Sequence, residues 1–206
     1  MKHFENNNIL TDQQHGYRNR CSTETQLIRI VDLLAKGLEA RSQTDVISLD
    51  YARAFDTVPF RRLLLKMRYY GMGKLLPWLE DFITTRWQKV VVNGSMSRLV
   101  KVLSGIPLGT VIAVLCFLLF INDLPDNINN SFSGIFCDDT VLAKKISNIQ
   151  DSIQLQNDLD KVVQWTQLWG LRFNVDKCVV MSVTNKQQTL SHNYTLYNKT
   201  ISKENI

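Results

Sequence analysis

The chain has 206 residues, 45% of them hydrophobic and 21% charged, which excludes global intrinsic disorder and is enough to bury a sizeable core. Lysine and arginine number 24 against 19 aspartate and glutamate residues, a net charge of +5. The excess is local, because residues 53–101 carry ten basic and three acidic side chains, a net +7. Such a surface suits a polyanionic partner, although solvated lysine and arginine side chains commonly make basic patches as well.

The spacing of the cysteines and the length of the apolar runs argue against a zinc protein, a disulfide-rich protein and a membrane protein. The four cysteines lie far apart with no CxxC pair, and predict neither a zinc site nor a disulfide framework. The most apolar run, residues 111–121, is well short of the roughly 20 residues that cross a bilayer. The polar start of the chain lacks a secretory signal pattern. We therefore expect an intracellular protein, cytoplasmic or nuclear, with no membrane partner.

The first half of the chain predicts helices around one strand. Capping hydroxyls precede apolar residues at helical spacing, which predicts a helix over residues 23–41. The short β-branched segment 45–50 predicts a strand that ends at Asp50. A proline in the first turn begins a helix over 59–70, and a further helix is expected over about 75–86.

The middle of the chain predicts a hairpin and a buried helix. Residues 87–92 and 99–103 have strand composition, and Asn93-Gly94 between them is a turn signal for antiparallel strands. The apolar stretch 111–121 is long enough for a buried helix.

A second hairpin is predicted with acidic residues at its tip. Residues 132–136 and 141–145 have strand composition and flank Asp138-Asp139. Apolar residues at helical spacing then predict a long amphipathic helix over 149–169, which a glycine ends, and a final core strand over 178–183.

The order of these elements predicts an α+β fold. Without the insertion between Pro59 and Leu103, it reads strand, helix, strand, strand, helix, strand, which is the split βαβ arrangement of ferredoxin-like domains. The first strand and the middle hairpin are neighbours in that topology. We therefore expect Asp50, Asp138 and Asp139 to converge.

Three converging carboxylates repel one another unless a cation neutralises them. Mg²⁺ prefers oxygen ligands and commonly uses one or two carboxylates together with substrate phosphates. The chemistry that this implies is phosphoryl or nucleotidyl transfer. The alternative is that the Asp138-Asp139 pair is an ordinary solvated turn.

A series of short motifs occurs in one order along the chain. The segments are Leu10–Arg18, Ser48–Asp56, Ser104–Thr110, Phe120–Leu124, Phe136–Asp139 and Trp165–Cys178. In sequence and order they resemble motifs of the reverse transcriptases of non-LTR retrotransposons, the LINE- or jockey-like elements, over roughly residues 10–183. The resemblance implies a partial polymerase palm that carries out RNA-directed DNA synthesis with an RNA template, a DNA primer and deoxynucleoside triphosphates.

The resemblance also implies roles for the acidic residues and for one lysine. Asp50 and Asp138 would be the principal ligands of two Mg²⁺ ions, with Asp139 as a supporting acid and the Tyr51 carbonyl as a further ligand. Lys177 matches a lysine that protonates the departing pyrophosphate. Its alternative interpretation is a surface lysine ahead of a strand.

Substrate contacts are implied at six positions. They are Arg18, Tyr51, Phe55, Gly105, Pro107 and Gly109. Phe55 matches the aromatic residue that excludes a ribose 2′-hydroxyl, and it can at the same time be an ordinary core aromatic. The two glycines permit close approach of backbone to a ligand, which matches a loop that touches nucleotide and template.

The sequence departs from the family in the same loop. Leu108 stands where a glutamine is usual, which removes an amide able to bond template or nucleotide. We expect a partial fingers segment over residues 1–44, the palm over 45–183, and an extension toward a thumb over 184–206. The alternative to an active polymerase is a catalytically silent retroelement remnant that at most binds nucleic acid. An RNA-binding module of RRM type is disfavoured because its aromatic strand motif is missing.

Overall fold

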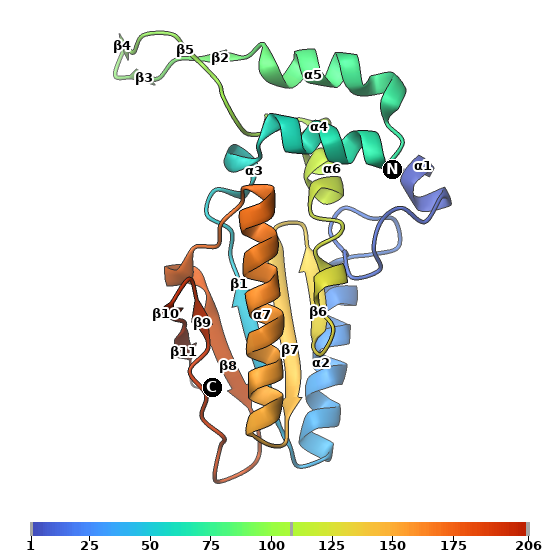
Figure 1. The fold of residues 1–206 in the computed structure, drawn as a ribbon, viewed down its shortest axis with the longest axis vertical. Helices are drawn as coiled ribbons and strands as arrows, with labels where there is room; N and C mark the ends of the chain where they lie inside the picture. Colours follow the sequence, from blue (N-terminus) through green and yellow to red (C-terminus); the bar gives the residue numbers. More distant parts are fainter. Residues whose placement is uncertain (1, 108, 205–206) are drawn as a thin grey trace. The chain divides into compact units, whose positions relative to one another are not determined.

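The computed structural model describes residues 2–107 and 109–204, which form two compact units. We call residues up to 52 together with those from 121 onward the sheet unit, and residues 53–120 the helical unit. The architecture is a mixed α and β one, as the sequence predicts. Each unit is described by itself (Figure 1).

The sheet unit is built on five strands in the order β11-β8-β1-β7-β6. Their bounds are Gln43–Leu49 for β1, Phe132–Phe136 for β6, Asp139–Ile146 for β7, Val179–Val183 for β8 and Ser202–Glu204 for β11. Neighbouring strands are antiparallel except β11, which runs parallel to β8. The predicted strands at 45–50, 132–136, 141–145 and 178–183 are confirmed, with small shifts at their ends.

Two long helices pack on this sheet. Helix α2 (Thr23–Glu39) begins at a capping box between Ser22 and Thr25, and α7 (Ile149–Trp169) begins at one between Asn148 and Asp151. Gly170 ends α7 in the left-handed conformation, with φ 76°. Helix α7 packs on β7, whereas α2 packs on β6 and β1 (Figure 1). Both helices were predicted, α7 with the same bounds.

The part of the sheet unit after β8 contains strands that sequence patterning did not predict. Strands β9 (Thr195–Leu196) and β10 (Lys199–Thr200) form a small hairpin before β11. The Tyr194 hydroxyl donates to Asp45 Oδ2 at 2.7 Å, and the Gln43 amide exchanges two hydrogen bonds with the Leu190 backbone, both 2.9 Å. Buried polar side chains of β1 therefore hold this segment against the sheet.

The remaining elements of the sheet unit are short. They are α1 (Lys2–Asn6) and the 3₁₀ turns η2 (Pro125–Asn127) and η3 (Val175–Lys177).

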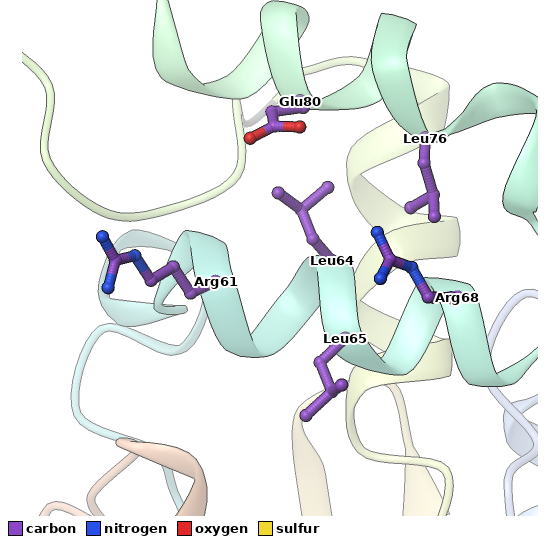
Figure 2. A pocket seen from close by; sticks show the side chains of 6 residues that line it. All are labelled: Arg61, Leu64, Leu65, Arg68, Leu76 and Glu80. Carbon is purple, nitrogen blue, oxygen red and sulfur yellow. The ribbon is translucent and has the colours of Figure 1, made fainter.

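The helical unit is organised around α4, which packs against both α5 and α6. Its elements are α3 (Ala54–Thr57), α4 (Phe60–Tyr69), η1 (Gly73–Leu75), α5 (Leu76–Thr84), β2 (Trp87–Gln88), β3 (Val91–Val92), β4 (Ser95–Met96), β5 (Val100–Lys101) and α6 (Val111–Phe120). The buried Lys66 side chain donates to the carbonyl of Phe120, so it caps the end of α6. A shallow hollow of about 210 Å³ lies between α4 and α5, where Leu64, Leu76 and Glu80 face one another (Figure 2).

The predicted hairpin after α5 consists of two short antiparallel ladders rather than two continuous strands. Strand β2 pairs with β5, and β3 pairs with β4. Asn93 and Gly94 both have positive φ, 49° and 80°, which is the turn geometry that their sequence predicts. All side chains of these four strands are exposed.

All four cysteines are free thiols. Over the described residues, none of the helices combines the length and apolar composition that a membrane span requires.

Candidate active site

Asp50 lies at the end of β1, where the segment leading into β8 holds its backbone. The Asp50 carbonyl accepts a hydrogen bond from the Asn174 N–H at 2.8 Å, and the Asp50 N–H donates to the Cys178 sulfur at 3.5 Å. Tyr51 forms an isolated antiparallel bridge with Phe173. These contacts fix the stretch of backbone that carries the Asp50 carboxylate.

Asp138 and Asp139 lie at the turn between β6 and β7, as predicted. In the antiparallel ladder of β1 and β7, Leu49 is opposite Thr140. The next residues along the two strands, Asp50 and Asp139, therefore lie at the same end of the sheet. Asp50 and Asp138 are half-buried, and Asp139 is exposed.

The electrostatics of this sheet end are those of a cluster of like charges. Partial burial of the Asp139 carboxylate, and then the charges of Asp138 and Asp50, raise its pKa above the ordinary value. Lys177 supplies the opposite charge, with Nζ 3.9 Å from Asp50 Oδ1. Both partners are substantially exposed, so this ion pair alone contributes little stability. The three acids and the lysine that the sequence singled out thus lie at the same end of the sheet.

The acids do not form a complete metal site by themselves. Within the part of the chain that the structure describes, no three His, Cys, Asp or Glu side chains are grouped so that they could hold a metal ion. A cation at this sheet end would take further ligands from substrate or backbone. Mg²⁺ commonly binds in this way, through one or two carboxylates and the phosphates of a substrate.

Tyr51 and Arg18 have structural contacts of their own. The Tyr51 ring is buried and packs on Phe173 with 4.5 Å between ring centroids, and its burial raises the pKa of the hydroxyl. Any contact of Tyr51 with a ligand would therefore involve its backbone. The Arg18 guanidinium donates to the carbonyls of Thr11 and Gln14, which closes the loop that contains them.

Four of the predicted substrate-binding residues belong to the helical unit. The Phe55 ring is half-buried and stacks on Phe117 of α6, with 4.5 Å between centroids and 26° between planes. Pro107 is half-buried, and its carbonyl accepts from the Thr110 hydroxyl at 2.8 Å. Gly109 has φ 85°, and a Cβ there would have no atom within 4 Å. Leu108, where the family motif is altered, lies outside the described residues.

Gly105 has a structural reason to be glycine. Its φ is 87°, and a Cβ there would lie 2.6 Å from the Asp56 carbonyl oxygen. The backbone of the same loop bonds to the segment after β1, through Gly105 N–H to the Val58 carbonyl and Ile106 N–H to the Phe55 carbonyl, at 2.9 and 2.8 Å. The close approach that the sequence predicts therefore involves the protein's own backbone.

A basic hollow of about 460 Å³ opens beside this loop within the helical unit. Arg53, Arg86 and Lys101 line it together with Asp56, Gln88 and residues 102–106. The Arg86 guanidinium donates to the Gly105 carbonyl, so part of this charge also holds the loop in place. The hollow locates one part of the basic surface predicted over residues 53–101.

Some residues with a structural role at the site belong to the sequence motifs, although the motifs assign them no role. Asn174 and Cys178 hold Asp50, as described above. The indole N–H of Trp165 donates to Asp123 Oδ1 at 3.3 Å, which ties α7 to the segment before β6. These roles depend on contacts distant in sequence, so local spacing carries no signal for them.

Comparison with known proteins agrees with the motif order. The sequence model of the family described as "Reverse transcriptase (RNA-dependent DNA polymerase)" matches residues 1–199. The chain belongs to this family. Its reverse transcriptase relatives include "RNA-directed DNA polymerase from mobile element jockey" of Drosophila melanogaster, 28% identical over 181 residues, and the protein of the same name from Drosophila funebris, 28% identical over 182 residues. The resemblance to jockey-like elements is thereby confirmed.

The matches differ in how much of each protein they cover. Each jockey match covers 84% of this reverse transcriptase chain and 20% of the relative, so the chain spans about a fifth of their length. A solved structure, apo telomerase from Candida tropicalis truncated from the C-terminal domain, superposes with a TM-score of 0.63 at 12% identity. That match covers 92% of this chain and 39% of the telomerase chain. At this identity it shows a shared fold.

Proposed function

We propose that this chain is the catalytic core of an RNA-directed DNA polymerase, which adds deoxynucleotides to a DNA primer on an RNA template. The observation that carries the proposal is the meeting of Asp50, Asp138, Asp139 and Lys177 at one end of the sheet in a member of the reverse transcriptase family. Carboxylates in this arrangement suit nucleotidyl transfer assisted by divalent cations.

Asp50 and Asp138 would hold the cations, with Asp139 as the supporting acid and the Tyr51 carbonyl as a further ligand. The fit of the site to a cation rests on the oxygen chemistry of these carboxylates at one end of the sheet. Burial, and then the neighbouring charges of Asp138 and Asp50, raise the pKa of Asp139 in agreement with this. When bound, two Mg²⁺ ions would activate the primer 3′-hydroxyl and stabilise the leaving pyrophosphate. Lys177 is placed beside Asp50, where its ammonium could give a proton to the pyrophosphate.

We further propose that the sheet unit is a ferredoxin-like palm. The strand order β8-β1-β7-β6 within the larger sheet supports this topology, with β11 added at the edge. Residues 45–183 would form the palm, residues 1–44 a part of the fingers, and residues 184–206 an extension toward a thumb. We expect the polymerase to act inside the cell.

Primer extension tests the proposed activity. The chain and a longer polypeptide with flanking polymerase sequence are each given a homopolymer RNA template, a DNA primer, deoxynucleotides and Mg²⁺. We expect the longer polypeptide to extend the primer and the isolated chain to do so poorly. Absence of extension by both, with nucleic-acid binding retained, would instead identify a silent remnant.

Phe55 provides a prediction about sugar selection. A ring beneath the sugar discriminates by steric clash, so in a polypeptide that polymerises Phe55→Ala should raise ribonucleotide relative to deoxynucleotide incorporation by about tenfold to a hundredfold. Phe55→Tyr keeps the ring and serves as the control. Because Phe55 also stacks on Phe117, the unfolding midpoint is measured alongside. An unchanged ratio with a large stability loss would leave only the packing role.

The basic surface predicts binding that weakens steeply with salt. Each phosphate contact releases counterions, so the logarithm of affinity should fall linearly with the logarithm of salt concentration. Lys101 lines the basic hollow, and Lys101→Ala should lower the slope by about 1. Lys203→Ala, on β11 of the sheet unit, should leave the slope unchanged. Fluorescence anisotropy with a primer–template duplex measures both, and salt-independent binding would contradict the electrostatic argument.

A further inference from the structure

The turn that carries Asp138 contains an unfavourable backbone conformation. Cys137 has φ 56°, in the left-handed region that residues with a side chain seldom adopt outside turns. Its side chain is buried, and burial raises the pKa of the thiol to about 12, so the thiol is neutral at physiological pH. The Phe136–Asp139 pair closes this two-residue hairpin loop, and a further contact to Cys137 stabilises its conformation.

The Gln14 side chain makes that contact. Its Oε1 accepts a hydrogen bond from the Cys137 N–H at 2.9 Å, and its Nε2 donates to the Cys137 carbonyl at 3.4 Å. One amide thus bonds both backbone groups of the residue before Asp138. Gln14 is 1% exposed, so water does not compete for these bonds.

The segment that presents Gln14 is itself fixed on both sides of it. Ile135 of β6 donates its N–H to the Gln13 carbonyl at 2.9 Å and accepts from the His15 N–H at 2.8 Å. The Gly16 N–H also donates to Gln14 Oε1, at 2.7 Å. A Cβ at Gly16 would lie 2.4 Å from the Cys137 nitrogen, so glycine is what allows this segment to approach the turn.

The segment is anchored again farther from the turn. The Thr11 N–H donates to Asn122 Oδ1 at 2.8 Å, and Asn122 Nδ2 donates to the Ile9 carbonyl at 2.7 Å. The His15 ring bonds to the Thr25 hydroxyl at 2.8 Å. Gln14 therefore reaches the turn from a rigid support, which is the arrangement needed to position another residue's functional group.

We infer that Gln14 is a positioning residue for Asp138: its amide holds Cys137 in the left-handed turn and thereby sets the direction of the Asp138 carboxylate. The inference rests on the proposed function for the role of Asp138, whereas the hold of Gln14 on the turn is independent of it. In this role Gln14 acts through the backbone of Cys137.

The test compares two buried glutamines, one against the turn after β6 and one against β6 itself. Gln14→Met removes the hydrogen bonds at the turn and keeps the volume. Gln26→Met makes the same chemical change in α2, where the Gln26 amide lies against Gly134 in the middle of β6. Amide hydrogen exchange measures the protection of the Cys137 N–H. A Mn²⁺ titration followed by NMR measures how far the metal broadens the amide signals of Asp50 and Asp138.

We expect Gln14→Met to speed exchange at Cys137 about tenfold, the effect of one lost hydrogen bond, and to weaken the Mn²⁺ response about tenfold or more. Gln26→Met should change neither. Gln14→Glu retains an acceptor oxygen, so it should keep the Cys137 amide protected. If Gln14→Met does not fold, this second variant still tests the inference.

Three results would overturn the inference. They are unchanged exchange and Mn²⁺ response in Gln14→Met, equal effects of Gln26→Met, and loss of Cys137 protection in a folded Gln14→Glu. Failure of the proposed function looks different, because the unaltered chain would then show no broadening at Asp50 and Asp138. In that case, slow Cys137 exchange that depends on Gln14 would still support the conclusion that Gln14 holds the turn. Exchange that does not depend on Gln14 would contradict that conclusion.

Discussion

Asp138→Asn should lower primer extension by about a thousandfold in a polypeptide that polymerises, with little change in its folding or nucleic-acid affinity. A carboxylate that binds a catalytic cation contributes several kcal/mol to transition-state stabilisation, and about 4 kcal/mol corresponds to a thousandfold in rate. The amide keeps the size of the side chain but loses the charge. Asp50→Asn should have a similar effect, since the two acids are proposed to share the cations.

The control is Asp126→Asn, an exposed residue of η2 that undergoes the same chemical change. It should leave extension within about twofold, which is a negligible free-energy difference. A second measurement on the chain itself does not need activity. Because the Asp138 charge helps to raise the pKa of Asp139, Asp138→Asn should lower that pKa toward its ordinary value in a carboxyl NMR titration. Extension that stays within tenfold of normal would remove Asp138 from the proposed site.

The parts of the fold that sequence predicts are those specified locally. Helix α7 has the same bounds as its prediction because Asn148 and Asp151 cap one end and Gly170 ends the other. The acidic hairpin is likewise local, since strand-forming residues flank Asp138 and Asp139 on both sides. Given these elements, the ladder between β1 and β7 is enough to bring Asp50 to the same sheet end.

The parts that sequence did not predict depend on contacts between distant residues. Strands β9, β10 and β11 are two or three residues long, too short for a periodic pattern, and Asp45 and Gln43 of β1 hold the segment before them. The polar residues within the buried strand β1 were the only sequence feature that indicated a further segment packed against it. Gln14 lies within the first of the sequence motifs, but the motif does not indicate its role, because its partner is 123 residues away.

Asp158 should be among the largest single contributions to the stability of the sheet unit. Its carboxylate is fully buried in α7 and accepts four hydrogen bonds from one loop before β6. The donors are the backbone N–H groups of Asn129 and Asn130, the Asn130 side-chain amide and the Ser131 hydroxyl, at 2.8 to 3.3 Å. Hydrogen bonds to a charged group are the strong ones, so we expect Asp158→Asn to lower the free energy of unfolding by about 3 kcal/mol at pH 7.

The same carboxylate predicts how that difference changes with pH. Burial alone would raise the pKa of Asp158, but the hydrogen bonds from Asn130, Ser131 and Asn129 outweigh burial and hold the pKa below its ordinary value. A lowered pKa in the folded state means that the stabilisation is complete above the unfolded value and is lost as the pH falls through the folded value. Urea unfolding at pH 7 and at pH 3 should therefore show a smaller gap between Asp158→Asn and the unaltered chain at pH 3. The control is Asp160→Asn, at an exposed position of the same helix, which should lower the free energy of unfolding by less than about 0.5 kcal/mol at both pH values. If Asp158→Asn lowers that free energy equally at pH 7 and pH 3, the charge of Asp158 does not carry the stabilisation.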